Sequence, residues 1–339
     1  MRRGVVTAGA LTVDRVKRVD GWPAQDGLAT IEDESHEGGA SSFNMAVDLR
    51  RLDAPFPVAT VGLLGEDADA SLIRGALAAD GIDVSGIRTT REAPTSYTDV
   101  ISDRVTGRRT FFHRQGCNAI ATPDDYDVSA SSARWLHMGM PGVHRTMDAP
   151  WQGDANGWVT VLRRARAAGI RTNVELVSLA PARIAAVARP LLPHLDALVV
   201  NDVEIGAVAG LATVRDGATD AAACLRAARS VLEAGPMDLV AVHFPRGAVA
   251  VTRDGTVASQ PSVAVPEDAV AGANGAGDAF AAGMLIALHE GWPLRRGLVL
   301  AHAAAAASLR ALTTIGSIEP WPACLALAER WGWRDPLPL

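Results

Sequence analysis

Residues 219–244 read TDAAACLRAARSVLEAGPMDLVAVHF, and this stretch carries the pattern that decides the fold. Its first part (219–235) has the apolar spacing of an amphipathic helix and ends in a glycine, a common helix stop. Its second part, DLVAVHF (238–244), is a short apolar run of strand length. A helix followed closely by a buried strand is the repeating unit of a parallel sheet covered by helices.

The same alternation of helix and strand patterns occurs along most of the chain. Asp67, just after Glu66, introduces a helix that runs to about Ala79, and Gly81 fits its end. Three further strand-like runs lie next to helical patterns, namely PVATVGLL (57–64), IRTNVEL (170–176) and DALVVN (196–201). The pattern predicts an α/β fold, with a mainly parallel central sheet and helices on both faces.

Two regions, about 11–36 and 95–116, break this alternation and consist of short β pieces and turns. The segment VTGRRT within the second region predicts a hairpin turn flanked by strands. These pieces form either a small sheet over a site or extra edge strands of the main sheet. We find no linker, so we expect a single domain over residues 1–339 that contains both regions.

Composition and charge exclude several classes of function. The net charge is −6 and no basic stripe is present, which argues against nucleic-acid binding. No apolar run approaches the roughly 20 residues of a membrane span, and GVVTAGALTV near the N-terminus is too short and too weakly apolar for a signal peptide. Cys117, Cys224 and Cys324 lie far apart and match no metal or redox spacing. We expect free thiols and a cytoplasmic protein.

The segment GANGAGDAF (272–280) places glycines and a carboxylate just before an apolar helical stretch. Helix N-termini expose unpaired N–H groups, and glycine lets an anion approach them closely. Gly275, Ala276 and Gly277 therefore suit an anion cradle, with Asp278 in the first turn of the helix.

A carboxylate beside an anion cradle weakens simple phosphate binding, because like charges repel. It fits phosphoryl transfer, in which Asp278 takes a proton from an attacking hydroxyl while backbone amides stabilise the transferred group. The alternative is an ordinary glycine-rich turn with Asp278 as a helix-capping acid. The segment matches neither the Walker loop nor the GxGxxG dinucleotide motif.

GAGDAFAAG (275–283) resembles the C-terminal signature of the ribokinase/PfkB carbohydrate-kinase family. Other pieces resemble the family in the expected order and cover roughly residues 4 to 318. They are TAGALTVDRV (7–16), EGGASSFNMAVDLRRL (37–52), the segment 58–87, RTFFHRQGCNAI (109–120) and NDVE (201–204). The resemblance implies a ribokinase-like fold with a small β lid over a sugar, and transfer of the γ-phosphoryl group of ATP with Mg²⁺.

The resemblance also implies roles for particular residues. Asp278 matches the catalytic base, and Gly275, Ala276 and Gly277 match the anion hole.

The remaining matched positions bind the two substrates. Asn201 and Glu204 match the pair near the phosphates, with Glu204 holding Mg²⁺ through water. Asp14, Gly39 and Asn44 match the sugar-binding positions.

The sequence departs from the family pattern at three places. Gly272 and Ala273 replace the first two residues of DTxGAGD, which argues against activation by a monovalent cation such as potassium. Ala40 takes the place of the second glycine of the N-terminal motif, which predicts a slightly tighter sugar pocket.

The nucleotide-side loop of the family reads HFPRG (243–247) here. Gly247 matches a nucleotide-binding glycine of the family loop. Arg246 either reaches a phosphate or is a solvated surface residue. His302 falls near the usual adenine contact, with a packed helix histidine as the alternative.

Three more residues are candidates on chemical grounds. His113 and Arg114 are neighbours on the expected lid strand, where alternation sends only one of them inward. Arg114 facing the pocket would bind an acidic substrate group. Glu175 ends a strand, where α/β sheets place ligand sites, although a helix-capping role is equally compatible.

We therefore expect an ATP- and Mg²⁺-dependent kinase that phosphorylates a hydroxyl of a small sugar or sugar derivative. The alternatives are a nucleoside or 2-keto-3-deoxy sugar-acid kinase on the same fold, or a sugar- or nucleotide-binding regulator whose chemistry has decayed. In the related family lids pair between subunits, so a homodimer is compatible with the resemblance. The sequence does not name the sugar.

Overall fold

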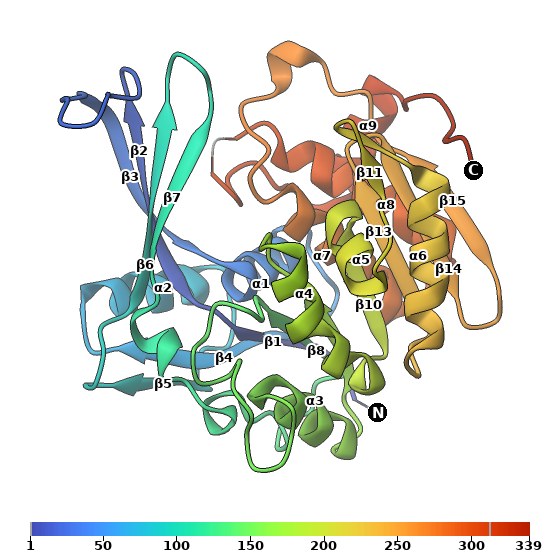
Figure 1. The fold of residues 1–339 in the computed structure, drawn as a ribbon, viewed down its shortest axis with the longest axis horizontal. Coiled ribbons are helices and arrows are strands. Elements are labelled where there is room, and N and C mark those ends of the chain that lie inside the picture. Colours follow the sequence, from blue (N-terminus) through green and yellow to red (C-terminus); the bar gives the residue numbers. More distant parts are fainter. Residues whose placement is uncertain (1, 312) are drawn as a thin grey trace.

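The computed structural model describes residues 2–311 and 313–339. Its main feature is a nine-stranded sheet in the order β15-β14-β13-β10-β9-β8-β1-β4-β5 (Figure 1). Strands β13, β14 and β15 pair antiparallel, whereas the other neighbours pair parallel. The strands are β1 (Val5–Gly9), β4 (Val58–Gly65), β5 (Ile87–Thr90), β8 (Trp135–Gly139), β9 (Arg171–Glu175), β10 (Ala197–Asn201), β13 (Leu239–Phe244), β14 (Gly247–Thr252) and β15 (Val257–Pro261).

Helices cover both faces of this sheet, as the alternating pattern predicts. One core lies beneath α1, α2, α7, α8 and α9, and a second core lies beneath α3, α4, α5 and α6. The helices are α1 (Ser41–Arg51), α2 (Ala68–Ala79), α3 (Gly157–Ala167), α4 (Pro181–Ala188), α5 (Asp202–Ala209), α6 (Ala221–Glu233), α7 (Ala276–Glu290), α8 (Leu294–Ser308) and α9 (Trp321–Trp331). Strand residues alternate between the cores, since Val5 packs in the first and Val6 in the second.

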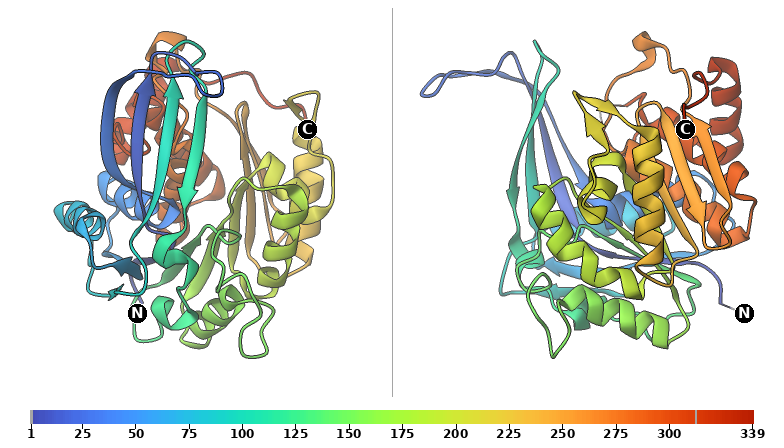
Figure 2. Two further views of the ribbon diagram at one scale, coloured as in Figure 1. Left: turned by 60° about the vertical axis from the view of Figure 1, so that its left-hand side comes forward. Right: turned by 45° about the vertical axis from the view of Figure 1, so that its right-hand side comes forward.

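A separate four-stranded sheet stands off the main body (Figures 1 and 2). Its order is β3-β2-β6-β7, with β2 (Thr12–Val19), β3 (Ile31–Gly39), β6 (Ser96–Asp103) and β7 (Arg109–Arg114). The two regions that break the helix–strand alternation therefore pair with each other rather than extend the main sheet. A two-stranded ladder, β11 (Val214–Arg215) and β12 (Ala218–Thr219), completes the strands assigned within the described residues.

The helix signals in the sequence act locally as expected. Asp67 caps α2 by accepting a hydrogen bond from the Ala70 N–H at 2.9 Å. Helix α4 ends at Ala188 and the chain continues as a 3₁₀ turn, because Pro190 and Pro193 cannot donate the backbone bonds of a regular helix. None of the described helices is both long and apolar enough to cross a membrane.

Candidate active site

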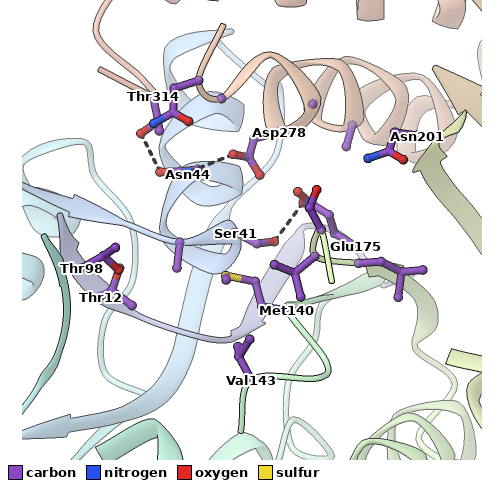
Figure 3. Close-up of a pocket in the computed structure, with 18 of the residues that line it drawn as sticks. Thr12, Ser41, Asn44, Thr98, Met140, Val143, Glu175, Asn201, Asp278 and Thr314 are labelled. Carbon is purple, nitrogen blue, oxygen red and sulfur yellow. Dashed lines mark hydrogen bonds between the residues drawn. The ribbon is translucent and has the colours of Figure 1, made fainter. Parts of the chain in front are cut away.

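A pocket of about 610 Å³ lies between the small sheet and the carboxyl ends of the parallel strands (Figure 3). Glu175 and Asn201, the last residues of β9 and β10, line it from the main sheet. Thr12, Asp14 and Phe111 line it from the small sheet. Parallel α/β sheets place ligands at this edge, where the strand ends and the following loops converge.

The glycine loop brings Asp278 to this pocket. Gly275 is the N-cap residue of α7 and has φ 79°, in the left-handed region that favours glycine. A Cβ atom on Gly275 would lie 2.2 Å from the Thr314 carbonyl oxygen, so no side chain fits there. Gly275, Gly277 and Asp278 all line the pocket, and Asp278 lies in the first turn of the helix. The backbone of this turn and the Asp278 carboxyl group therefore line the same pocket.

Asn44 holds the Asp278 side chain. The Asn44 Nδ2 group donates to Asp278 Oδ2 at 2.8 Å, and Thr314 Oγ1 donates to Asn44 Oδ1 at 3.0 Å (Figure 3). Burial and the neighbouring Glu175 carboxylate raise the pKa of Asp278 well above its ordinary value. The sequence comparison assigns Asn44 to the sugar, and the structure adds a direct contact with the expected base.

Glu175 lies at the centre of a second set of hydrogen bonds. Ser41 Oγ donates to Glu175 Oε2 at 2.9 Å, and His137 Nε2 lies 3.3 Å from the same oxygen. Burial raises the pKa of Glu175, and it lowers the pKa of His137 to about 4, so this histidine is neutral near pH 7. Sequence reasoning missed Ser41 and His137. The only signal for His137 is a polar residue within the apolar strand WLHMG (135–139).

Asp14 and Gly39 meet at the base of the small sheet. Thr12 Oγ1 donates to Asp14 Oδ1 at 3.3 Å, and burial raises the pKa of Asp14 to about 6. A Cβ atom on Gly39 would lie 2.3 Å from Asp14 Oδ2, so glycine is needed for this close approach. Ala40 lines the pocket with φ 71° and ψ 161°, a backbone conformation essentially restricted to glycine.

Asn201 and Glu204 form a capping box at the start of α5. Asn201 Oδ1 accepts from the Glu204 N–H at 2.8 Å, and Glu204 Oε2 accepts from the Asn201 N–H at 3.0 Å. Both residues line the pocket. Burial raises the pKa of Glu204 to about 7. The NDVE segment therefore starts a helix and presents polar groups to the pocket at once.

Two of the expected binding residues lie elsewhere. On β7 the alternation sends Phe111 and His113 into the pocket, whereas Arg114 lies over the Tyr97 ring, 5.9 Å from its centroid, on the other face. His302 is buried in α8 and packs edge-on against Phe280. The assignments of Arg114 to the substrate and of His302 to the nucleotide stay predictions.

The loop HFPRG reaches the pocket only through His243, which ends close to Gly277. Arg246 is exposed in the turn that follows β13, and Gly247 begins β14 with φ 159°. Their assignment to the nucleotide stays a prediction.

Gly272, where the related kinases have aspartate, faces the small sheet. A Cβ atom on Gly272 would lie 2.5 Å from Nη2 of Arg109, the first residue of β7. Both residues line a second cavity of about 790 Å³, which shares Asp14, Val100, Asn274 and Thr314 with the first one. Because Gly272 has no side chain, the Arg109 guanidinium can lie against it.

An α/β fold with a stand-off sheet, and a carboxylate beside the backbone amides at a helix start, form a site that suits phosphoryl transfer. The model of the pfkB family of carbohydrate kinases matches residues 2–322. The chain belongs to this family, whose members are phosphotransferases with an alcohol group as acceptor.

Individual relatives agree with this family. The 1-phosphofructokinase of Rhodobacter capsulatus is 30% identical over 327 residues, which are 94% of this chain and 93% of that protein. An ATP-dependent ribose-1-phosphate kinase of Halopiger xanaduensis is 29% identical over 123 residues, or 36% of this chain. That match spans only 40% of the length of the relative.

Solved structures share the fold. Ribokinase of Arabidopsis thaliana, complexed with ribose and ATP, has a TM-score of 0.78 at 21% identity, and the match covers 97% of this chain and 99% of that one. A nucleoside kinase of Methanocaldococcus jannaschii has a TM-score of 0.73 at 17% identity, with coverage of 96% and 98%. The expected ribokinase-like α/β fold with a separate small sheet is confirmed.

Proposed function

We propose that this chain transfers the γ-phosphoryl group of ATP to a hydroxyl of a small, uncharged sugar, with Asp278 as the general base. The observation that carries the proposal is the position of Asp278, which enters the pocket beside the amides of Gly275 and Gly277. The acceptor hydroxyl lies between Asp278 and the γ-phosphate. Asp278 accepts its proton as the new P–O bond forms, and the amides offset charge on the transferred group.

The acceptor lies against the small sheet in this proposal. Asp14 accepts hydrogen bonds from sugar hydroxyls, and Asn44 both donates and accepts. The residues 11–36 and 95–116 act as a lid within a single kinase unit. Closure of the lid excludes water, which otherwise competes as acceptor.

The phosphates lie on the side of Asn201 and Glu204. Among the described residues, no group of three or more His, Cys, Asp or Glu side chains is arranged to hold a metal ion by itself. A single carboxylate such as Glu204 suits Mg²⁺, which keeps several waters and binds through one or two carboxylates and the substrate phosphates. The ion supplies charge neutralisation at the phosphates.

The lining of the pocket favours an uncharged acceptor. Four carboxyl groups line it, those of Asp14, Glu175, Glu204 and Asp278, and no lysine or arginine of the described chain is among its lining residues. Burial lowers the pKa of His113, so this histidine is neutral as well. A carboxylate or phosphate on an acceptor confined to this pocket would lack a cationic partner, whereas Arg18, Arg104 and Arg109 line the adjoining cavity. Two of the relatives are named for sugar phosphates.

The test is release of ADP from Mg·ATP across matched acceptors. The panel pairs neutral sugars with their acids and phosphates, and adds nucleosides, which are also uncharged. We expect kcat/KM for the best neutral acceptor to exceed that of its charged counterpart by at least about 100-fold, since an unpaired charge is costly to bury. A preference for sugar acids or sugar phosphates would contradict the neutral acceptor. Binding without turnover across the panel would favour the decayed regulator.

A further inference from the structure

Asp278 is not the only carboxyl group at this point of the pocket, because Glu175 lines it as well and its side chain lies beside that of Asp278. Two buried carboxyl groups in this position can form a hydrogen bond only if one of them carries a proton. Figure 3 shows the two side chains close together, Asp278 from α7 and Glu175 from the end of β9. The general base therefore has a partner that competes for the same proton.

The donors around the pair are unequal in number. Asp278 receives one side-chain donor, the Asn44 Nδ2 group at 2.8 Å. Glu175 receives the Ser41 hydroxyl at 2.9 Å and has His137 Nε2 at 3.3 Å. Donors stabilise the charged form of a carboxyl group, so Glu175 is the more easily ionised member.

A buried chain of polar groups fixes this arrangement. Asn173 Nδ2 donates to His137 Nδ1 at 3.0 Å, which leaves the proton of the neutral ring on Nε2. That nitrogen faces Ser41 Oγ at 3.1 Å and the Glu175 carboxylate. Residues of β9, β8 and α1 therefore aim two donors at Glu175. This arrangement of donors favours the charge on Glu175 and the proton on Asp278.

Other charged groups around the pair are mostly acidic. Asp48 faces it from α1, Glu204 from α5, Asp14 from β2, and the neutral His137 and His243 from β8 and β13. The surplus of carboxyl groups opposes full ionisation of the pair.

We propose that Glu175 is a positioning residue that acts through Asp278: the two carboxyl groups share one proton in the empty pocket, and this proton must leave before Asp278 can accept another. The inference rests on the proposed function. During transfer the acceptor oxygen bonds to the γ-phosphorus, the bond from that phosphorus to the bridging oxygen breaks, and ADP leaves with the electron pair. The acceptor proton passes to Asp278 and returns the pair to its singly protonated state.

Two variants shift this equilibrium in opposite directions. Glu175→Gln removes the neighbouring negative charge, so the acidic limb of the kcat/KM profile should move to lower pH by about one unit or more. Ser41→Ala removes a donor from Glu175, so the same limb should move to higher pH. If Glu175 and Ser41 were important only for the structure, both variants would have a lower maximal kcat/KM, but the pH of the acidic limb would not change. Glu329→Gln, an exposed site on α9, controls for the change in net charge and should move nothing.

A measurement of stability separates this inference from the proposed function. Because the folded-state pKa values of both members are raised, the pair favours folding below about pH 4 and loses this contribution as pH rises through the folded-state values. Between pH 5 and 9 the Tm of the wild type should fall more steeply than that of Glu175→Gln or Asp278→Asn. If Tm fell with pH equally in the wild type and both variants, and the acidic limb of kcat/KM did not move, the shared proton would be contradicted. If no acceptor in the panel were phosphorylated but the Tm curves diverged, the proposed function would be wrong and the shared proton would still stand.

Discussion

At the scale of single residues, the pocket depends on contacts that side chains make across long stretches of sequence. Asn44 and Asp278 are 234 positions apart and are joined by one hydrogen bond. The sequence motifs identify both residues, because each belongs to a short pattern with its own chemistry. They do not reveal Ser41 and His137, since only the packing of β8 against β9 and α1 brings these two to Glu175.

Asp278→Asn tests the base directly. The amide keeps the shape of the side chain but cannot accept the proton, so kcat should fall roughly 10²- to 10⁴-fold, the usual size of a general-base effect. ATP binding, measured by calorimetry, should change little. Turnover near that of the wild type would remove Asp278 from its proposed role.

Asp14 should make acceptor binding dependent on pH. Its pKa of about 6 means that the ionised, hydrogen-bond-accepting form prevails only above that pH. With ATP saturating, KM for the acceptor should rise as pH falls through about 6, approaching tenfold per unit well below it. Asp14→Asn should raise KM and flatten this dependence, and a KM that is independent of pH in the wild type would contradict the assignment.

Ala40 stores backbone strain at the start of α1. Its conformation costs a non-glycine residue roughly 1–3 kcal/mol, so Ala40→Gly should raise the free energy of unfolding by about 1 kcal/mol after the entropy cost of glycine. Ala78→Gly, at an exposed site in α2, should instead lower it by roughly 0.5–1 kcal/mol. Denaturant unfolding of both variants checks the opposite signs.

At the scale of elements, α1 and α7 pack against each other around an unusual buried acid. Asp48 of α1 is fully buried, and neither of its carboxylate oxygens has a hydrogen-bond partner among the described residues. Burial and the nearby Asp278 raise its pKa well above the ordinary value. The sequence gives no sign that this acid lies inside the protein.

Asp48→Asn should therefore stabilise the protein, increasingly so as pH rises. The folded-state pKa of Asp48 exceeds its unfolded-state value of about 4, so wild-type stability is retained below that pH and lost as pH rises through the folded-state value. The difference in unfolding free energy between variant and wild type should grow from pH 4 to pH 8. Asp53→Asn, at an exposed site just after α1, should show a small and constant difference.

At the scale of the molecule, sequence alternation predicts the parallel sheet and its two helical layers, because period and length distinguish helices from buried strands. It also marks the two irregular regions. Their pairing into one small sheet follows from the family resemblance rather than from their residues, since short strands do not specify distant partners. The orientation of β7, which sends His113 inward and Arg114 outward, depends on a register that no local pattern fixes.

The main sheet and the small sheet line the same pocket, so a bound ligand should stabilise the two sheets together. Mg·ATP at about 100 times its dissociation constant should add about 2.7 kcal/mol to the free energy of unfolding, and an acceptor should add a further increment. Thermal unfolding with each ligand and with both measures this. An acceptor that leaves Tm unchanged at saturating concentration would contradict binding to the folded state.

The capping box at the start of α5 limits how Glu204 can serve an ion. One of its two carboxylate oxygens is already committed to the Asn201 N–H. The other oxygen would hold an ion at this position, directly or through a water molecule, while the cap of the helix stays intact. The remaining ligands of such an ion would be waters and the substrate phosphates, so its binding would depend on the nucleotide.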